Sequence, residues 1–310
     1  MNMRSFLPQR WRSKLEATRH AEAITGVLGT APVVPKTDGL VLFSMIGTKV
    51  LLPYLVAVKS LWGELQRGRV AILDDGTLTA QDRAILAHHC GDPEIMALRD
   101  VVLNEFPAGG TWERLLTILD RRQSEYWMQI DSDTVTVGPV PEVAEAIARN
   151  RSFILRGEAG AVPPMPTGDF HARFYADGEH NGHVQGRIES RMDTIRSERG
   201  WRYMRGCSGF AGFAATGAGR PLASAFLAEM TRMIGEEAVT EWGTEQVTSN
   251  FVLSNETDPV VLPYERYLNY WCDPWEEDAA FVHFVGTHRH DNGAYIAASV
   301  HAIERMKARG

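Results

Sequence analysis

Short apolar runs alternate with segments of helical spacing along the first half of the chain. Residues 40–46 (LVLFSMI), 69–73 (RVAIL) and 126–130 (YWMQI) are continuous apolar runs typical of buried strands. A further short strand is expected at residues 100–103. Helical spacing between and after these runs predicts helices at about residues 50–65, 79–90, 112–122 and 141–149. The alternation predicts an α/β fold with a largely parallel sheet covered by helices.

Local signals support several of these boundaries. Thr79 is a favourable N-cap, Gly91 stands just past the end of the expected helix, and Pro141 suits a first helical turn. The second half of the chain is less regular. Residues 158–199 are rich in Gly, Pro, His and Arg and predict an active-site flap or an inserted hairpin.

Small residues fill positions 206–219 and allow close approach of backbone to a ligand or a strand. No internal repeat or low-complexity linker divides the chain. We therefore expect one domain at residues 38–310, preceded by a helical extension at residues 1–37. The remaining expected elements are helices at residues 221–234, 244–253 and 294–307 and an apolar run at residues 281–286.

Composition excludes several classes of protein. The chain has 310 residues, 44% of them hydrophobic and 23% charged, which are ordinary globular values. Its net charge of −7 gives no overall attraction to nucleic acid, so no nucleic-acid partner is expected. The three cysteines, Cys90, Cys207 and Cys272, are far apart and lack zinc-finger spacing, so we expect reduced thiols in a cytoplasmic protein.

Neither a secretory signal nor a membrane span is expected. No continuous apolar segment follows the basic residues within positions 1–20, and Lys49 and Pro53 interrupt the most apolar stretch, residues 40–62. The basic N-terminal helix, which includes Arg4, has two open interpretations. It either makes peripheral contact with an anionic membrane surface or packs against the domain.

Two aspartates follow directly after the strand at residues 126–130. In an extended chain Asp131 and Asp133 point to the same side, at the sheet edge where α/β proteins bind ligands. Two adjacent carboxylates repel each other, and a hard divalent cation is the usual reason to place them together. The sequence therefore indicates a metal site here, although acids in a surface turn are the alternative.

This DxD resembles that of the GT-A nucleotide-sugar glycosyltransferases, and the segment HFVGTHR at residues 283–289 extends the resemblance. It is similar to the H-[FY]-x-G-x-x-[KR] motif of the glycogenin-like and lipooligosaccharide galactosyltransferase-like group, glycosyltransferase family 8. The resemblance implies a single GT-A (Rossmann-like) domain with a mixed, mostly parallel sheet flanked by helices. It also implies that Asp131, Asp133 and His283 hold the metal, while Gly286 and Arg289 contact the diphosphate.

Three shorter segments are similar to further motifs of these enzymes. Asp74 and Asp75, in a DDG turn, match a strand-end motif in which an acid contacts the nucleoside; a structural turn is the alternative. Glu245 and Gln246 match a helix start that lies beneath the donor sugar, and they are the candidate catalytic residues. The residues that match a small-residue loop facing the transferred sugar are Ser208 and Gly209.

The resemblance implies a metal-dependent hexosyltransferase that uses Mn²⁺ or Mg²⁺. Its donor would be a nucleotide sugar, in particular a UDP-sugar, its acceptor a saccharide or another hydroxyl compound, and its outcome retention of anomeric configuration. The chain has eight tryptophans, and Trp242, Trp271 and Trp275 among them are suited to stack on sugar rings, although most tryptophans are core or boundary residues.

Two alternatives use the same residues. The segment IDSDTV at residues 130–135 also matches the nucleophile motif of haloacid-dehalogenase-like phosphatases, in which Asp131 would be phosphorylated. Those enzymes carry the motif on their first strand, whereas at least two strands, at residues 40–46 and 69–73, are expected before it here. The second alternative is a non-catalytic GT-A-shaped protein that binds nucleotide sugars. Zinc is not expected, because no histidine has ligand spacing with the cysteines or lies in an HExxH motif.

Overall fold

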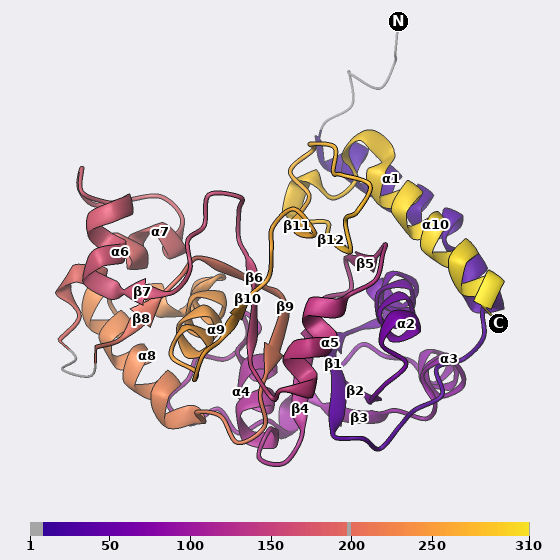
Figure 1. Cartoon of the computed structure of the whole chain (residues 1–310), viewed down its shortest axis with the longest axis horizontal. Coiled ribbons are helices and arrows are strands. Elements are labelled where there is room, and N and C mark those ends of the chain that lie inside the picture. The colour runs from indigo at the N-terminus through magenta and orange to yellow at the C-terminus, as the bar shows by residue number, and fades with distance from the viewer. Residues whose placement is uncertain (1–8, 197–199, 310) are drawn as a thin grey trace, which may run out of the picture.

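A seven-stranded sheet forms the centre of the chain in the computed structural model, which describes residues 9–196 and 200–309 (Figure 1). Its strands are β1 (Leu40–Ile46), β2 (Arg69–Asp74), β3 (Glu94–Ala97), β4 (Tyr126–Ile130), β6 (Phe153–Arg156), β9 (Gly206–Phe213) and β10 (Val260–Val261). They lie in the order β10-β6-β9-β4-β1-β2-β3. Only β9 runs antiparallel to its neighbours, so the expected mixed, mostly parallel sheet is confirmed.

The sheet separates two apolar cores. Successive side chains of β1 point to opposite faces: Leu40 and Leu42 enter one core, and Val41 and Phe43 enter the other. The first core is covered by α2 (Leu51–Leu65), α3 (Ala80–Cys90), α5 (Pro141–Ala148) and α10 (Ala294–Arg309). The second is covered by α4 (Trp112–Arg121), α8 (Arg220–Ile234) and α9 (Thr244–Ser254). Burial on both faces explains why the central strands are continuously apolar.

A small second sheet joins the C-terminal region to the end of β4. It contains β11 (Tyr267–Asn269), β12 (Phe281–His283) and β5 (Thr134–Thr136), with β12 in the middle. The antiparallel pairing of β12 with β5 places His283 opposite Thr134. The register therefore brings the histidine next to the Asp131–Asp133 segment, although 150 residues separate them in sequence.

The irregular segment after β6 contains two short helices, and the two short strands that flank these helices pair with each other. These are α6 (Thr167–Phe174), α7 (Val184–Glu189) and the antiparallel pair β7 (Met165–Pro166) and β8 (Arg202–Tyr203). Glu189 is fully buried and accepts hydrogen bonds from the hydroxyls of Tyr175 and Tyr203, at 2.7 and 2.8 Å. It also forms an ion pair with Arg205. These bonds attach the segment to the start of β9.

The first described helix, α1 (Gln9–Ala23), lies alongside α10 (Figure 1). The His20 ring stacks on Tyr295 at 3.7 Å, and His20 Nε2 lies 3.1 Å from the Ser299 hydroxyl. Arg4 lies outside the described residues, and both membrane contact and a cytoplasmic location stay predictions. No helix in residues 9–196 and 200–309 has the length and apolarity to cross a bilayer.

The prediction of a strand at residues 100–103 is wrong. Residues 101–103 form no strand, and the edge of the sheet is instead β3, which is followed by a short 3-10 helix at Leu98–Asp100. β3 is a half-buried edge strand of four residues, and its IMA segment is no more apolar than the VVL segment at residues 101–103, so composition does not distinguish the two segments. Val102 is exposed, which shows that apolar composition alone was misleading there.

The N-cap of α3 provides a test of the local structure. The Thr79 hydroxyl accepts from the Asp82 N–H at 3.1 Å, and the Asp82 carboxylate accepts from the Thr79 N–H at 2.8 Å. Thr79→Ala removes one half of this capping box and should lower the free energy of unfolding by about 1 kcal/mol in urea denaturation. Thr79→Ser keeps the hydroxyl and should retain most of that stability. Equal losses in both variants would contradict the role of the cap.

Candidate functional site

A cavity of about 770 Å³ opens beyond the carboxyl end of β4. Most of the residues selected from the sequence line it, although they come from distant parts of the chain. They are Asp131, Asp133, Ser208, Gly209, Glu245, Gln246, His283, Gly286 and Arg289. Asp74 and Asp75 are not among the lining residues. The fold thus gathers four of the five sequence motifs into one site.

Asp131, Asp133 and His283 form a compact group of metal-ligand types. One candidate ligand atom from each lies within 4.8 Å of the other two, and His283 Nε2 is 3.2 Å from Asp133 Oδ1. Asp131 directly follows β4, and His283 ends β12. Two carboxylates and one imidazole suit a divalent ion such as Mn²⁺, with coordination positions left for ligand oxygens. The donor set therefore fits the metal that the resemblance implies.

The orientation of His283 is set by Asn269 at the end of β11. The Asn269 side-chain amide donates to the carbonyls of Arg156 and Gly157 at 2.8 and 2.9 Å, which leaves its oxygen as an acceptor. That oxygen lies 2.9 Å from His283 Nδ1 and can accept its N–H. Nε2 then faces Asp133, as metal-binding histidines require. Asn269 was not predicted as a functional residue, because an asparagine on a short strand carries no distinctive sequence signal.

Opposite charges surround Asp133. Burial acts to raise the pKa of its carboxyl group, but His283 and Arg289 outweigh that effect and lower the pKa to about 2. Arg289 forms an ion pair with this carboxylate, and its Nε donates to the Phe284 carbonyl at 3.1 Å. Burial likewise acts to lower the pKa of His283, yet Cys207 and Asp133 raise it well above the ordinary value. Asp133 is therefore held as a carboxylate.

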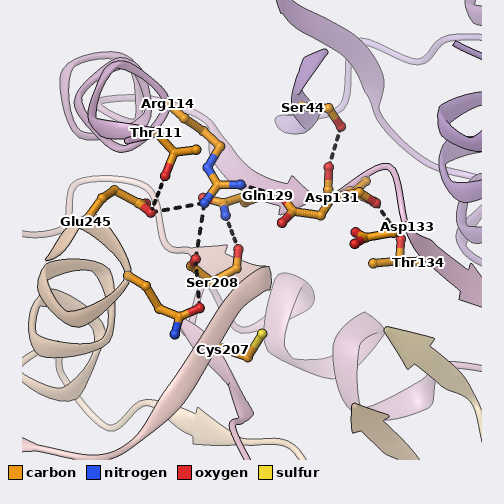
Figure 2. A network of polar contacts seen from close by, with 12 residues as sticks. Ser44, Thr111, Arg114, Gln129, Asp131, Asp133, Thr134, Cys207, Ser208 and Glu245 are labelled. Atoms are coloured by element: carbon orange, nitrogen blue, oxygen red, sulfur yellow. Dashed lines mark hydrogen bonds and ion pairs between the residues drawn. The ribbon is translucent and has the colours of Figure 1, made fainter. Parts of the chain in front are cut away.

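Arg114 links three walls of the cavity (Figure 2). It was not among the residues predicted from the sequence. Its buried guanidinium forms ion pairs with Asp131 and with Glu245, at 3.1 Å for the latter. It also donates to the Ser208 hydroxyl at 3.1 Å. Desolvation acts to lower the pKa of Arg114, but the two carboxylates raise it overall. A positive charge thus holds Asp131 beside the candidate donor-sugar residues.

Glu245 and Gln246 begin α9 and face the same cavity. Glu245 is 1% exposed, and its Oε2 accepts from the Thr111 hydroxyl at 2.8 Å as well as from Arg114. No described residue is hydrogen-bonded to its Oε1. Burial raises the pKa of Glu245, and Arg114 only partly opposes this. Gln246 donates to the side-chain oxygen of Gln185 at 3.2 Å, which connects α9 with the segment after β6.

The aspartates of the DDG turn, Asp74 and Asp75, stabilise the turn itself through hydrogen bonds. The Asp74 carboxylate accepts from the N–H groups of Gly76 and Leu78 at 2.8 and 3.2 Å and pairs with Arg83. Asp75 accepts from the Thr77 N–H at 2.9 Å. These bonds fit the structural-turn alternative. A role of Asp74 and Asp75 in binding a nucleoside stays a prediction.

The irregular segment after β6 supplies another wall of the cavity. Its lining residues are Gly157, Glu158, Tyr175, His180, His183, Gln185 and Gly186. Two exposed tryptophans also line the cavity: Trp242 is 70% exposed and Trp271 is 48% exposed. Residues 197–199 of the expected flap lie outside the described residues. The site therefore combines a charged floor with an aromatic and histidine-rich rim.

Comparisons with known proteins give distant structural likenesses alone. No protein-family model matches the sequence, and no curated protein matches it. Among solved structures the chain is similar to the bifunctional glycosyltransferase WbbM in its apo form, with a TM-score of 0.48 and 13% identity over 87% of this chain. This chain spans about half of WbbM, covering 51% of its length.

Two further solved structures are similar to the chain. Galactosyltransferase LgtC, in complex with donor and acceptor sugar analogs, has a TM-score of 0.49 and 10% identity over 87% of this chain and 95% of its own. Mouse xyloside xylosyltransferase 1, in its apo form, has a TM-score of 0.40 and 13% identity over 79% of this chain and 96% of its own. At these TM-scores and sequence identities the likeness is no evidence for a substrate or a mechanism. The proposals about both are based on the site itself.

Gly209 permits the close packing of the histidine. A Cβ at this position would lie 2.2–2.7 Å from atoms of the His283 ring. Gly209→Ala should therefore displace His283, lower the free energy of unfolding by about 1–3 kcal/mol and weaken Mn²⁺ binding in calorimetric titration. Gly168→Ala is the matched control, because a Cβ there meets no atom within 4 Å. Unchanged Mn²⁺ affinity in Gly209→Ala would show that the position of His283 does not matter for metal binding.

Proposed function

We propose that this protein is a metal-dependent glycosyltransferase that moves a sugar from a nucleotide-diphosphate donor, in particular a UDP-sugar, to a saccharide or other hydroxyl acceptor. The observation that carries the proposal is the group Asp131, Asp133 and His283 at the floor of a cavity of about 770 Å³. Arg289 adds a cationic group beside it. Carboxylates, an imidazole and a guanidinium in one cavity are the groups that bind a metal–diphosphate pair.

The metal ligands and Arg289 have separate tasks in this proposal. A Mn²⁺ or Mg²⁺ ion held by Asp131, Asp133 and His283 would supply Lewis acidity to the donor diphosphate. The guanidinium of Arg289 is suited to bind phosphate oxygens in a fork and to stabilise the charge that develops on the leaving group. Gly286 has a positive φ of 50° and borders the same cavity, where its backbone can approach the diphosphate without a side chain in the way.

Ser208, Glu245 and Gln246 are the proposed contacts of the transferred sugar. The Ser208 hydroxyl lies 3.5 Å from the Gln246 side-chain oxygen, so the two residues form one continuous polar wall. Arg114 fixes Glu245 and Asp131 relative to each other, which sets the separation between the sugar wall and the metal ligands. Retention of anomeric configuration is proposed from the motif resemblance alone.

The rim of the cavity suits a saccharide acceptor. Trp242 presents an exposed ring beside His183, with the two ring centroids 5.8 Å apart. Exposed aromatic faces are favourable surfaces for the apolar faces of sugars, because both faces interact less favourably with water than with each other. We therefore assign acceptor binding to the side of the cavity that carries Trp242.

The metal requirement is the first test of the function. Asp131→Asn removes a charged ligand and should reduce Mn²⁺-dependent UDP binding by about 10–100-fold or more, since even indirect changes at metal sites have that effect. EDTA should abolish sugar transfer from a UDP-sugar, and Mn²⁺ should restore it. Asp92→Asn is the control, because Asp92 is exposed and does not line the cavity.

The chemistry of Asp131 in the unmodified protein separates the alternatives. In a haloacid-dehalogenase-like phosphatase Asp131 would form an aspartyl-phosphate, which mass spectrometry of protein treated with phosphate monoesters would detect. A phosphorylated Asp131, or full activity in excess EDTA, would overturn the glycosyltransferase proposal. Tight UDP and Mn²⁺ binding without transfer or hydrolysis of any nucleotide sugar would instead indicate the non-catalytic binding protein.

Trp242 provides a test of the acceptor side. Trp242→Ala should raise KM for a saccharide acceptor by about 2–10-fold, the equivalent of an aromatic contact of about 0.5–1.5 kcal/mol, and leave the affinity for UDP unchanged. Phe174→Ala is the control, since Phe174 is 40% exposed but does not line the cavity. A loss of UDP affinity in Trp242→Ala would place this ring on the donor side.

A further inference from the structure

A second group of metal-ligand types lies at the edge of the main cavity. Cys272 follows β11, and His288 and Asp291 belong to the two 3-10 turns Gly286–His288 and Asp291–Gly293. Cys272 Sγ is 3.4 Å from His288 Nδ1 and 3.6 Å from Asp291 Oδ2, and the latter two atoms are 3.3 Å apart. The same three atoms therefore form a closed triangle.

The sides of this triangle match the edges of a tetrahedral zinc site. Metal–ligand distances of about 2.3 Å for sulfur and about 2.0–2.1 Å for nitrogen and oxygen give edges of about 3.5 Å for S···N and S···O and about 3.3 Å for N···O. The three observed distances differ from these values by about 0.1 Å. The three atoms are therefore already spaced as ligands of one ion would be.

We propose that Cys272, His288 and Asp291 bind a zinc ion, with the fourth position open to water or another small ligand. One thiolate, one imidazole and one carboxylate are ligands that zinc accepts together. The ligand set differs from that of Asp131, Asp133 and His283, whose two carboxylates favour a harder ion. In the described part of the chain these are the two groups of three such residues.

The position of the triangle places the proposed ion between two segments of the chain. Cys272 also borders a second cavity of about 380 Å³, whereas His288 borders the main cavity. The proposed ion would connect the segment after β11 with the turn that carries Gly286 and Arg289. Zinc would thereby hold the proposed phosphate-binding turn against the body of the protein. Sequence spacing conceals the group, because 16 residues separate Cys272 from His288 and the matching motif contains neither Cys272 nor Asp291.

Cobalt is a direct probe of this site, since thiolate-bound Co²⁺ has an intense charge-transfer band in the near ultraviolet. The experiment uses the full chain, kept reduced, with Asp131→Asn and Asp133→Asn to disable the other metal group. This protein should bind one Co²⁺ with the thiolate band, and added Zn²⁺ should remove the band. Competition with a chromophoric chelator then gives the zinc affinity.

Cysteine variants identify the ligand. Adding Cys272→Ser should abolish the thiolate band and lower zinc affinity on the order of 100-fold, as expected for the loss of one ligand. Cys207→Ser is the matched control, because Cys207 lies 3.2 Å from His283 and is the other thiol near a candidate metal ligand. Asp291→Asn should weaken zinc binding while the band remains.

The proposal is overturned if the band persists in Cys272→Ser, if it disappears in Cys207→Ser, or if the starting protein binds no zinc. Each readout is made without a nucleotide sugar and with Asp131 and Asp133 already replaced. Failure of the zinc proposal is therefore distinguishable from failure of the glycosyltransferase proposal, which is tested by Mn²⁺-dependent UDP binding.

Discussion

The arrangement of the site depends on the buried guanidinium of Arg114. It connects α4 with Asp131 after β4, Ser208 in β9 and Glu245 in α9, so one side chain fixes four elements. Without it, the buried Glu245 and the part-buried Asp131 would repel each other, and removing one partner of a buried ion pair typically costs about 3–5 kcal/mol. The charge on Arg114 offsets this repulsion and opposes the rise in the pKa of Glu245 that burial causes.

The register of strand pairing is the second feature on which the arrangement of the site depends. The pairing of β12 with β5 sets His283 opposite Thr134, directly after Asp133. A slip of one residue would turn the imidazole to the other face of the small sheet. Gly209 on β9 then allows the imidazole ring to lie against the backbone, where any side chain would collide with it. The metal ligands thus depend on backbone pairing between segments 150 residues apart.

Much of this arrangement follows from the sequence, and the exceptions have physical reasons. The central strands, the Thr79 cap and the helix ends were predictable because burial on both faces and capping leave local patterns. The edge strand β3 was not, since its short IMA segment is no more apolar than the neighbouring VVL segment at residues 101–103, which forms no strand. Asp131, Asp133 and His283 were found through motif spacing, whereas Arg114, Asn269 and Cys272 reach their partners only through tertiary pairing. A single arginine on a helix gives no sign of the three groups it will contact.

The packing of α1 on α10 has a consequence for biosynthesis. His20, near the beginning of the chain, stacks on Tyr295, near its end, and Ile24 and Val27 share a core with Ile303. A ribosome makes the first helix long before its partner exists, and contacts between distant segments form late because their loop must close first. The packing surface of α1 therefore stays uncovered until the segment that forms α10 has been made. The part of the apolar core that these two helices share forms only after α10 has left the ribosome.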